Sequence, residues 1–485
     1  MAGEVAKRTS GGPKTRHDRT GPRTASGTRS KGSKMTLDPM SMPAPGDAYR
    51  TRRRRIAAEL KRPMVVFAGQ PVPRNYADNT HPFRPGSTYA YFGGPPVEGA
   101  AWLIAPGSDG HEGCTLFRPD IPFEHAVWLG DTPPDTALAA AAGIAVAGVK
   151  PSDALERELA GREAAAIVPA CMTTAKWAET LGLQSPDQDE LLAIIDMRLI
   201  KDEHELAAMR RAAYVGIEAH RAAMRATKPG RCESDVAAAF HAVLVANHCL
   251  PSFTPLVTVR GEVLHRQGYT NAINAGDFML VDAGAEEPGG YASDITRTYP
   301  VNGSYSADQK RFYNVVLRAE REAMAACVPG KRYRDIHDLA ARVLCEGLVS
   351  EDLLRGDPAE LAERRAHTLF FSHGLGHLLG MDVHDMEDFG DLAGYAAGRT
   401  RRTAFGDKFL RLDRDLQPGM TLTIEPGFYV SPAIWRQDEL VAPFADCINR
   451  PAVDKLLAAN FGGIRIEDNV HILDSTSTSP EIFTK

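Results

Sequence analysis

The sequence predicts a protein of mixed helices and strands in which an α/β domain precedes a larger second domain. Between residues 49 and 188, short β-prone runs alternate with Ala-rich helical patterns, which is typical of an α/β domain. A polar break at residues 185–190 is followed by a long amphipathic pattern and by apolar runs that end in acids. Apolar residues make up 43% and charged residues 24% of the 485 residues. This ordinary globular composition excludes a collagen, a coiled-coil rod and a wholly disordered chain.

The N-terminus differs in composition from the rest of the chain. Residues 1–34 carry nine Lys or Arg against two acids, a net charge of +7, so the chain's −6 leaves −13 for residues 35–485. Because this Gly-, Ser- and Thr-rich stretch cannot bury a core, residues 1–45 are interpreted as a basic disordered tail. No aromatic residue is interleaved with these charges, so a nucleic-acid partner is not expected.

The first globular region, residues 46–190, is expected to hold strands near residues 64–68, 101–105 and 114–117. Its longest apolar stretch, residues 137–149, is shorter than the ~18 residues that span a bilayer, so no membrane partner is expected. The N-terminus lacks the apolar core of a secretory signal. The seven cysteines are scattered and form no CxxC pair. Reduced thiols and a cytoplasmic location are therefore expected.

The second region, residues 195–485, opens with a pattern that predicts a long helix over residues 203–227. The Lys228-Pro229-Gly230 sequence closes this helix, because proline and glycine do not continue it. The positions expected to pack inward recur at helical spacing. They are Leu206, Met209, Ala213, Ile217 and Met224.

Two acids end or begin strand-like runs on either side of a turn-rich segment. Asp282 closes the apolar run 278–281, and Asp294 opens the run 294–298 after the sequence EEPGG. A hairpin would bring the two acids to neighbouring strands. Two close carboxylates repel each other unless a positive charge lies between them. Two exposed acids flanking a turn are the alternative interpretation.

Three histidines form a second cluster. His373, His377 and His384 fall within twelve residues, among glycines and apolar side chains. A single histidine in such a setting is more often part of a core, but three together favour a binding site.

Two further segments carry charged groups whose burial would cost free energy unless a partner of opposite charge is present. Glu425 closes the β-prone run 421–424 directly before Pro426-Gly427, and a partly buried carboxylate there requires a cation. In residues 463–468, alternation places Arg465 and Glu467 on one face of a strand. An ion pair on an exposed strand is the alternative interpretation of that pair.

Together these segments supply four carboxylates and at least one imidazole. Such an oxygen-rich set suits hard, six-coordinate divalent ions such as Mn²⁺ better than tetrahedral structural zinc. Four acids can balance the charge of two divalent ions. The sequence therefore predicts a two-metal hydrolytic site.

The ordered motifs VDAG, SDITRTYP, HGLGHLLGMDVHD, TIEPG and RIED resemble the metal-ligand motifs of the pita-bread metallopeptidases, in the branch of aminopeptidase P and prolidase. Residues 52–94, with HPFRPGSTYAYFGG, resemble the start of the aminopeptidase P N-terminal domain. The resemblance implies an α+β fold, with a creatinase-like α/β domain over residues 46–190 and a pita-bread catalytic domain over residues 195–485.

The resemblance also implies ligand roles. Asp282 would chelate one metal, Asp294 and Glu467 would bridge both, and His377 and Glu425 would hold the other. Two Mn²⁺ ions are expected, with Co²⁺, Zn²⁺ or Fe²⁺ as alternatives.

Further residues match positions that bind substrate or support catalysis in the family. The resemblance implies that His265 and His384 bind substrate and stabilise the intermediate, and that His373 lines a proline pocket. Arg465 would order the network behind the metals.

The activity implied is that of an Xaa-Pro aminopeptidase, which hydrolyses the bond between an N-terminal residue and a following proline. A metal-bridging hydroxide would attack the carbonyl, and Glu425 would pass the proton to the leaving proline nitrogen. The expected partners are a proline-containing peptide and further copies of the chain, as a dimer or tetramer.

Three alternatives remain open. Arg411, in an insertion between His384 and Glu425, falls where prolidases carry an arginine that clamps the carboxylate of a dipeptide; an exposed loop arginine would look the same. A methionine aminopeptidase shares the fold but normally lacks so large an N-terminal domain. A creatinase-like or non-catalytic binding protein would be expected to lose metal ligands, and all five are retained.

Overall fold

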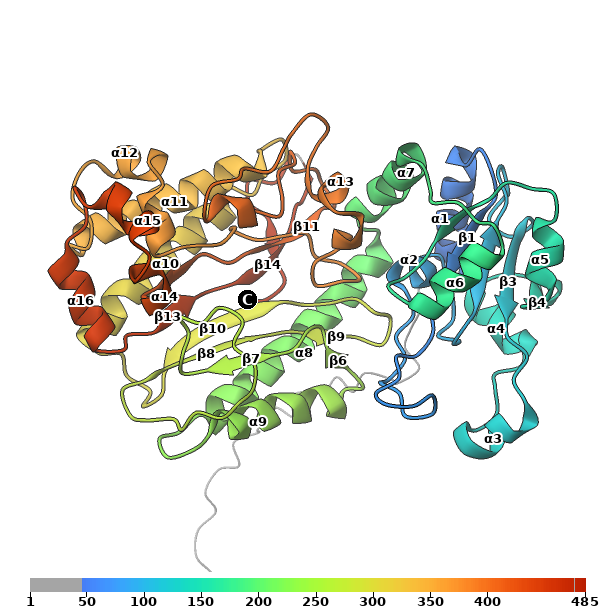
Figure 1. The fold of residues 1–485 in the computed structure, drawn as a ribbon, viewed down its shortest axis with the longest axis horizontal. Coiled ribbons are helices and arrows are strands. Elements are labelled where there is room, and N and C mark those ends of the chain that lie inside the picture. Colours follow the sequence, from blue (N-terminus) through green and yellow to red (C-terminus); the bar gives the residue numbers. More distant parts are fainter. Residues whose placement is uncertain (1–45, 475) are drawn as a thin grey trace, which may run out of the picture. The chain divides into compact units, whose positions relative to one another are not determined.

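The structure is a computed structural model that describes residues 46–474 and 476–485 (Figure 1). The basic tail predicted for residues 1–45 lies outside the described residues. The described residues belong to one compact unit. Among their helices, none combines the length and the hydropathy needed to cross a bilayer.

The N-terminal region alternates helices and strands. Its elements are α1 (Gly46–Glu59), β1 (Met64–Phe67), α2 (Ser87–Tyr91), β2 (Ala101–Ile104), β3 (Cys114–Arg118), α3 (Phe123–Leu129), α4 (Asp135–Ala142), η1 (Val146–Gly148), β4 (Val149–Pro151), α5 (Ala154–Leu159), β5 (Ala165–Ile167), α6 (Met172–Thr180) and α7 (Gln188–Leu199). The three strands predicted here are confirmed to within one residue at their ends.

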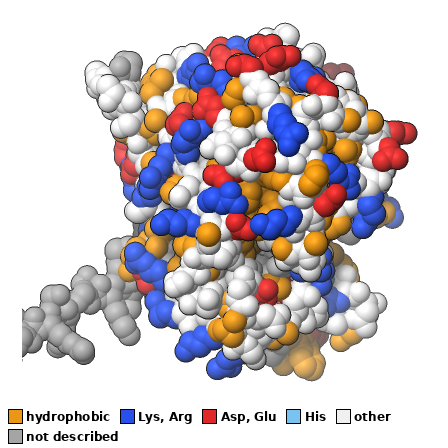
Figure 2. Space-filling model, turned by 90° about the vertical axis from the view of Figure 1, so that its left-hand side faces the viewer, with side chains coloured by type: hydrophobic (Ala, Val, Ile, Leu, Met, Phe, Trp, Pro, Cys, Tyr) orange, Lys and Arg blue, Asp and Glu red, His pale blue; other side chains and the backbone are white. Residues whose placement is uncertain are grey.

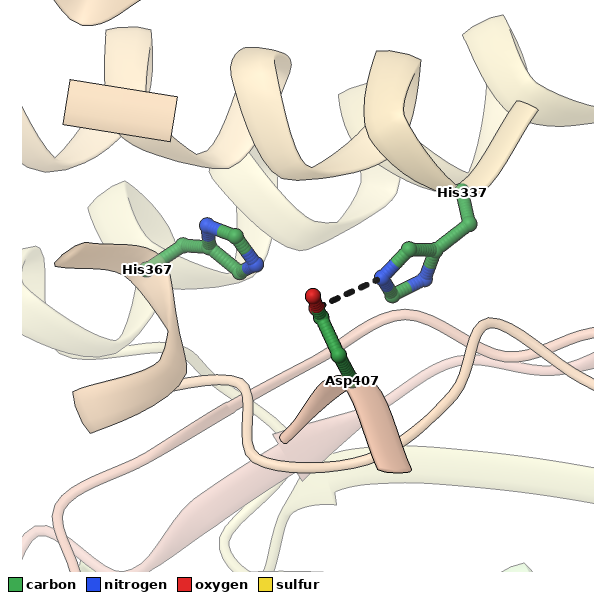
Figure 3. Close-up of side chains that lie close together, drawn as sticks. All are labelled: His337, His367 and Asp407. Atoms are coloured by element: carbon green, nitrogen blue, oxygen red, sulfur yellow. Dashed lines mark ion pairs between the residues drawn. The ribbon is translucent and has the colours of Figure 1, made fainter. Parts of the chain in front are cut away.

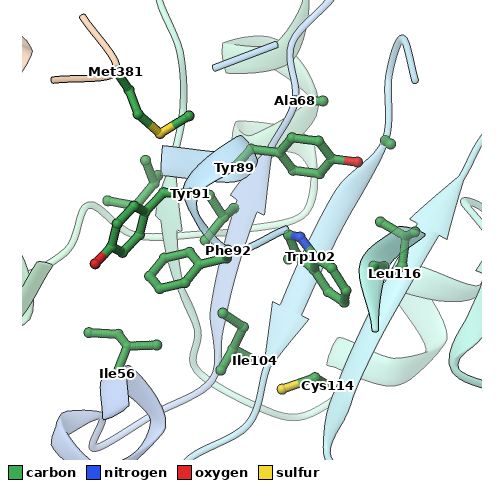
Figure 4. Packing of buried hydrophobic residues seen from close by; sticks show 14 of the residues in the cluster. Ile56, Ala68, Tyr89, Tyr91, Phe92, Trp102, Ile104, Cys114, Leu116 and Met381 are labelled. Atoms are coloured by element: carbon green, nitrogen blue, oxygen red, sulfur yellow. The ribbon is translucent and has the colours of Figure 1, made fainter. Parts of the chain in front are cut away.

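The five strands of this region form one mixed sheet in the order β4-β3-β2-β1-β5. The central strands β1, β2 and β3 pair antiparallel, and the outer strands β4 and β5 pair parallel to their neighbours. Trp102 of β2 lies fully buried in the cluster of aromatic and aliphatic side chains shown in Figure 4. Met381, from the distant second region, belongs to the same cluster. The two regions therefore share part of a core.

The C-terminal region begins with the long helix α8. Its elements are α8 (Glu203–Ala226), α9 (Glu233–Ala246), β6 (Leu250–Pro251), β7 (Leu256–Thr258), β8 (Phe278–Ala283), β9 (Ala285–Glu286), β10 (Ile295–Pro300), α10 (Ala307–Ala325), α11 (Tyr333–Ser350), α12 (Pro358–Glu363), η2 (Ala366–Leu369), η3 (Glu387–Phe389), α13 (Asp391–Gly394), η4 (Asp407–Phe409), β11 (Thr421–Ile424), β12 (Gly427–Tyr429), α14 (Pro432–Trp435), α15 (Asp438–Val441), η5 (Ala442–Phe444), α16 (Arg450–Ala458), β13 (Gly463–Arg465), β14 (Asp468–His471) and β15 (Glu481–Ile482).

Small antiparallel sheets carry the predicted site residues. One sheet has the order β10-β8-β7, a second β11-β14-β15, and β12 pairs with β13. Helices α8 and α9 pack on the first sheet, and α10 and α11 lie side by side next to the strands that follow (Figure 1). This mixture of helices and antiparallel sheets confirms the α+β class.

The helix predicted over residues 203–227 is α8, although its buried face differs slightly from the prediction. The side chains of Leu206, Met209 and Ala213 are buried, whereas Ile217 is half-buried and Met224 is exposed. The buried stripe also includes Ala212, Val215, Ala219 and Ala223. Met224 lies one position beyond that stripe, about 100° around the helix, so its predicted burial is wrong.

The polar break at residues 185–190 is the start of α7. The Asp187 carboxylate accepts a hydrogen bond from the Glu190 amide, and the Glu190 carboxylate accepts one from the Asp187 amide. This capping box satisfies amides that a helix N-terminus leaves free. The predicted division between residues 190 and 195 therefore falls within one helix, and the division into domains remains a prediction.

A buried group of charges joins α7 to the histidine-rich segment. The Asp385 carboxylate accepts hydrogen bonds from Arg198 at 2.7 Å and from Lys201 at 2.9 Å. The side chains of all three residues are at most 2% exposed. Two buried cations therefore share one buried carboxylate.

On the face shown in Figure 2, Lys and Arg side chains are interspersed with Asp and Glu side chains. Exposed pairs such as Arg364–Asp446 and Arg450–Asp454, each 2.7 Å apart, contribute little to stability individually. The charges that matter for the fold are the buried ones.

Replacing Asp385 by alanine should destabilise the protein strongly, because it leaves Lys201 buried without this counter-charge and leaves Arg198 with the partly exposed Asp382 alone. The expected loss in the free energy of unfolding is about 3–5 kcal/mol, measured by urea denaturation. Asp382→Ala is the matched control, since Asp382 also pairs with Arg198 but is 31% exposed; its expected cost is about 0–1 kcal/mol. Equal losses in the two variants would contradict the role assigned to the buried charges.

Candidate metal centre and substrate cavity

Three predicted ligands are brought together by pairing between strands. Asp282 lies near the end of β8, and Asp294 directly precedes β10, which pairs antiparallel with β8. Thr296 of β10 lies opposite Asp282 and also forms a bridge with Glu467, which follows β13. The predicted proximity of the two strands that carry Asp282 and Asp294 is confirmed.

The position of the fourth predicted ligand, His377, depends on the glycine before it. A side chain at Gly376 would place its Cβ 2.2 Å from the Thr423 carbonyl oxygen of β11, a distance that atoms cannot occupy. Glycine therefore lets the HGLGH segment lie directly against β11. There the His377 amide donates a hydrogen bond to the Thr423 hydroxyl.

The His377 ring is oriented with a free lone pair toward the acids. Its Nδ1 lies 2.9 Å from the Leu378 carbonyl oxygen, so Nδ1 must carry the proton and donate it. In the neutral ring, Nε2 then carries the lone pair; it lies 3.3 Å from Asp294 Oδ2 and 3.7 Å from Glu425 Oε1. A backbone carbonyl that fixes the tautomer in this way is typical of a histidine that binds metal.

The acids of this cluster carry more buried negative charge than the surrounding hydrogen bonds satisfy. Asp294 Oδ1 and Glu467 Oε1 are buried without a hydrogen-bond partner among the described residues. Burial and the charge of Asp282 raise the pKa of Asp294 well above its ordinary value. Burial and the charge of Asp294 do the same for Glu467, and burial raises the pKa of Glu425 to about 7. A cation at this place would relieve all three costs.

The guanidinium of Arg465 supplies positive charge next to these acids. It donates hydrogen bonds to Asp282 at 2.5 Å, to the Tyr429 hydroxyl at 2.9 Å and to the Thr296 hydroxyl at 3.2 Å. The Thr296 hydroxyl in turn donates to Glu467 at 2.7 Å. Arg465 and Glu467 are both buried, so the alternative of an exposed ion pair on a strand is excluded.

The donor set fits divalent metal ions. Ligand atoms of Asp294, His377 and Glu467 lie within 4.8 Å of one another, with orphaned oxygens and an unprotonated nitrogen among them. Carboxylate oxygens with one imidazole match the preference of ions such as Mn²⁺ and of similar divalent metals.

The cluster forms the wall of a cavity of about 700 Å³. All four residues predicted to bind substrate line it, together with phenylalanine side chains that make part of the wall apolar. These residues are His265, His373, His384, Arg411, Phe253, Phe405 and Phe409.

His373 is connected to the acidic cluster through Tyr429. His373 Nδ1 lies 2.8 Å from the Gly374 carbonyl oxygen and so donates to it, leaving Nε2 to accept from the Tyr429 hydroxyl at 2.8 Å. Burial and the charge of Arg465 lower the pKa of His373 to about 3. His373 is therefore neutral and held in one orientation.

His384 and Arg411 share one acid at the other side of the cavity. Glu387 lies 3.3 Å from His384 Nδ1 and accepts a hydrogen bond from Arg411 at 2.5 Å. The His384 ring centroid is 4.2 Å from that of His377. Burial and the nearby His377 lower the pKa of His384, and burial followed by the charge of Arg465 lowers that of His265.

Sequence reasoning missed three residues that organise this site: Thr296, Tyr429 and Glu387. Thr296 could have been found by alternation, since it lies two residues after Asp294 on the same strand face. For Tyr429 the indication is the nearby Gly427. A Cβ at that position would lie 2.3 Å from the Tyr429 hydroxyl oxygen, so the position requires glycine. Glu387 has no local signal, because its importance arises only from contacts with Arg411 and His384.

The fold and the site define a metallopeptidase of two regions, and comparison with known proteins identifies its family. The model of metallopeptidase family M24 matches residues 207–474, and that of the aminopeptidase P N-terminal domain matches residues 49–167. The chain belongs to metallopeptidase family M24.

Relatives and solved structures agree with this family over most of the chain. A Haemophilus influenzae protein named Xaa-Pro aminopeptidase is 32% identical over 408 residues, which cover 80% of this chain and 87% of that protein. A Homo sapiens protein named Xaa-Pro dipeptidase is 32% identical over 384 residues, or 74% of each chain. The structure of proline aminopeptidase P II from Yersinia pestis superimposes with a TM-score of 0.74 at 27% identity, covering 90% of this chain and 96% of that one.

Metal removal should destabilise the protein because it leaves the buried acids without counter-charge. Chelation is expected to lower the Tm by about 5 °C or more, measured by calorimetry with and without excess chelator. The double variant Asp294→Asn/Glu467→Gln should be about 1–3 kcal/mol more stable than the wild type when both are metal-free, yet bind less metal.

The exposed substitution Asp454→Asn is the matched control and should change neither quantity. A metal-free double variant less stable than metal-free wild type would contradict the charge crowding inferred for the cluster.

Proposed function

We propose that this chain is an Xaa-Pro aminopeptidase that hydrolyses the bond between an N-terminal residue and a following proline. The observation that carries the proposal is the orientation of the His377 lone pair toward Asp294 and Glu425 in the wall of a cavity large enough for a short peptide. Membership of family M24 and similarity to proteins named Xaa-Pro aminopeptidase support the proposal.

Five side chains would hold two divalent metal ions. The ligands would be the carboxylates of Asp282, Asp294, Glu425 and Glu467 and the imidazole of His377. Mn²⁺ is proposed, with Co²⁺, Zn²⁺ or Fe²⁺ as alternatives. When bound, such ions activate water and polarise a carbonyl group.

The chain's own residues would position the peptide and move the proton. The Glu425 carboxylate reaches both His377 and, at 3.9 Å, His373 Nδ1, so it can take a proton from water and deliver it to the leaving nitrogen. His265 and His384 would face the carbonyl oxygen from the cavity wall. A donated hydrogen bond from either would stabilise the negative charge that develops there.

Proline sets the requirement for a shaped pocket. The nitrogen of the scissile bond belongs to a tertiary amide and carries no hydrogen, so the enzyme cannot orient it by accepting a hydrogen bond from it. Contacts with the ring must provide the orientation instead. His373, held in place by Tyr429 and Gly374, would form part of this proline pocket, and Arg465 would keep Tyr429 in place from behind.

Purified protein with added Mn²⁺ should cleave Xaa-Pro-Yaa peptides at the bond before proline and leave Xaa-Ala-Yaa peptides intact. Glu425→Gln should lower kcat by about 10³-fold or more, because both a ligand and the proton carrier are changed. Product release can be followed by chromatography. Absence of any cleavage by folded, metal-loaded protein would overturn the proposed activity.

A dipeptidase is a second candidate, favoured by Arg411. Its guanidinium lines the cavity, where it could bind the carboxylate of an Xaa-Pro dipeptide. The ion pair with Glu387 already balances part of its charge. For this reason the aminopeptidase activity is preferred. Similarity to a relative named Xaa-Pro dipeptidase supports the dipeptidase alternative.

Substitution of Arg411 separates the two candidates. If Arg411 binds a substrate carboxylate, Arg411→Ala should raise KM for Xaa-Pro dipeptides about 10-fold or more and change KM for longer amidated peptides much less. Arg411→Lys tests whether charge alone suffices, since lysine lacks the bidentate geometry. Equal changes for dipeptides and amidated peptides would exclude a carboxylate clamp.

The cytoplasmic location, the dimeric or tetrameric assembly and the division into domains at residues 46–190 and 195–485 remain predictions from the sequence. Sedimentation analysis of the purified protein would test the assembly.

A further inference from the structure

A second group of buried ligand-type side chains lies outside the residues assigned above. His337 belongs to α11, His367 to η2 and Asp407 to η4, and their ligand atoms lie within 4.8 Å of one another. Figure 3 shows the two rings and the carboxylate converging from these three elements on one space. Each of the three residues is at most 3% exposed.

The two histidines have unsatisfied ring nitrogens. Nδ1 and Nε2 of both His337 and His367 are buried and have no hydrogen-bond partner in the part of the chain that the structure describes. Burial, and then the neighbouring His337, lower the pKa of His367 to about 3, so this ring is neutral and offers a lone pair. Buried polar atoms without partners are uncommon, and each calls for a ligand or an ordered water.

The carboxylate has one oxygen already used and one oxygen facing the histidines. Arg365 forms an ion pair with Asp407 Oδ2, and Arg402 lies 3.3 Å from the same oxygen. Asp407 Oδ1 instead lies 3.9 Å from His337 Nε2. Burial would raise the pKa of Asp407, but contact with His337 and the charge of Arg365 lower it to about 2. Asp407 is therefore an anion with Oδ1 available.

The two arginines do not fill the space between the rings. Both are partly exposed, and Arg402 also pairs with Asp338 at 3.1 Å. Their charges are thus shared with solvent and with a second acid. Both arginines would fix the orientation of the Asp407 carboxylate through its Oδ2 atom. Carboxylates that bind a metal are commonly oriented by such neighbouring hydrogen-bond donors.

We propose that His337, His367 and Asp407 bind a structural Zn²⁺ ion. Two imidazole nitrogens and one carboxylate oxygen are ligands that zinc accepts, in contrast to the oxygen-rich set in the cavity. In a tetrahedral site, ligand atoms ~2.0–2.2 Å from the zinc ion lie ~3.3–3.6 Å apart. The three ligand atoms lie within 4.8 Å of one another, so each would move by about 1 Å or less, and a water molecule can complete the tetrahedron.

The position of the site indicates what the ion does. Asp407 begins η4, which ends at Phe409. Phe409 and, two residues beyond it, Arg411 line the substrate cavity. Phe371 packs against the rings of both His337 and His367 and, with centroids 4.8 Å apart, against His373. The ion would fasten the insertion to α11 and η2, and so position one wall of the cavity without taking part in hydrolysis.

The test separates this site from the catalytic one. The full-length double variant Asp294→Asn/Glu467→Gln, stripped with chelator and then given zinc sulfate, should retain one Zn²⁺ per chain after gel filtration, measured by elemental analysis. Bound zinc should raise its Tm by about 3 °C or more. Adding His337→Asn and His367→Asn should abolish both the retained zinc and the rise in Tm.

His220→Asn is the matched control, since His220 is equally buried but belongs to neither ligand group; it should leave the zinc content unchanged. The proposal would be overturned if the folded variant Asp294→Asn/Glu467→Gln retained no zinc. It would also be overturned if the variant that carries His337→Asn and His367→Asn in addition retained its zinc. If the variants do not fold, anomalous diffraction at the zinc edge from wild-type crystals decides. A peak among the three side chains supports the site, and its absence overturns it.

Discussion

The crowding of four carboxylates in one buried place is the constraint on which the rest of the structure depends. These carboxylates come from segments up to nearly 200 residues apart: Asp282, Asp294, Glu425 and Glu467. Moving them from water to a buried place beside one another costs free energy, through lost hydration and mutual repulsion. The chain overcomes this cost with strand pairing on β8, β10 and β11 and with one deeply buried guanidinium, that of Arg465. Cations bound there would complete the charge balance and so contribute to the stability of the folded state as well as to its chemistry.

The same guanidinium links the acidic cluster to the substrate cavity. One face of Arg465 bonds Asp282 and the other bonds the Tyr429 hydroxyl, which in turn donates to His373. A change in charge at the cluster therefore reaches the proposed proline pocket through three hydrogen bonds. Because His373 is neutral, it holds its position by accepting from Tyr429, and it does not compete for the acids with the metal ligands.

The sequence could predict those features of the site that depend on local pattern. Acids at strand ends, alternation in residues 463–468 and clustered histidines each have a short-range signature, and the structure brings Asp282, Asp294, His377, Glu425 and Glu467 together. The predicted burial of Met224 fails because spacing alone does not fix which face of α8 is buried: the buried stripe runs through Ala219 and Ala223, one position before Met224. The pairing of Glu387 with Arg411, and of Asp407 with His337 and His367, joins residues 24 to 70 positions apart, and no local pattern encodes such contacts.

Buried charges also hold in place the irregular segment that forms one wall of the substrate cavity. The segment between His384 and Glu425 has mostly short helices and turns, with little regular hydrogen bonding to hold it. At one end Asp385 ties it to Arg198 and Lys201 of the α7–α8 junction, and near its middle Asp407 ties it to Arg365 beside η2. Each contact is costly to break, because it would leave an uncompensated charge in the interior. Arg411 and Phe409 lie after the second of these anchors, so the charges that hold the insertion also determine which substrate atoms the cavity can accept.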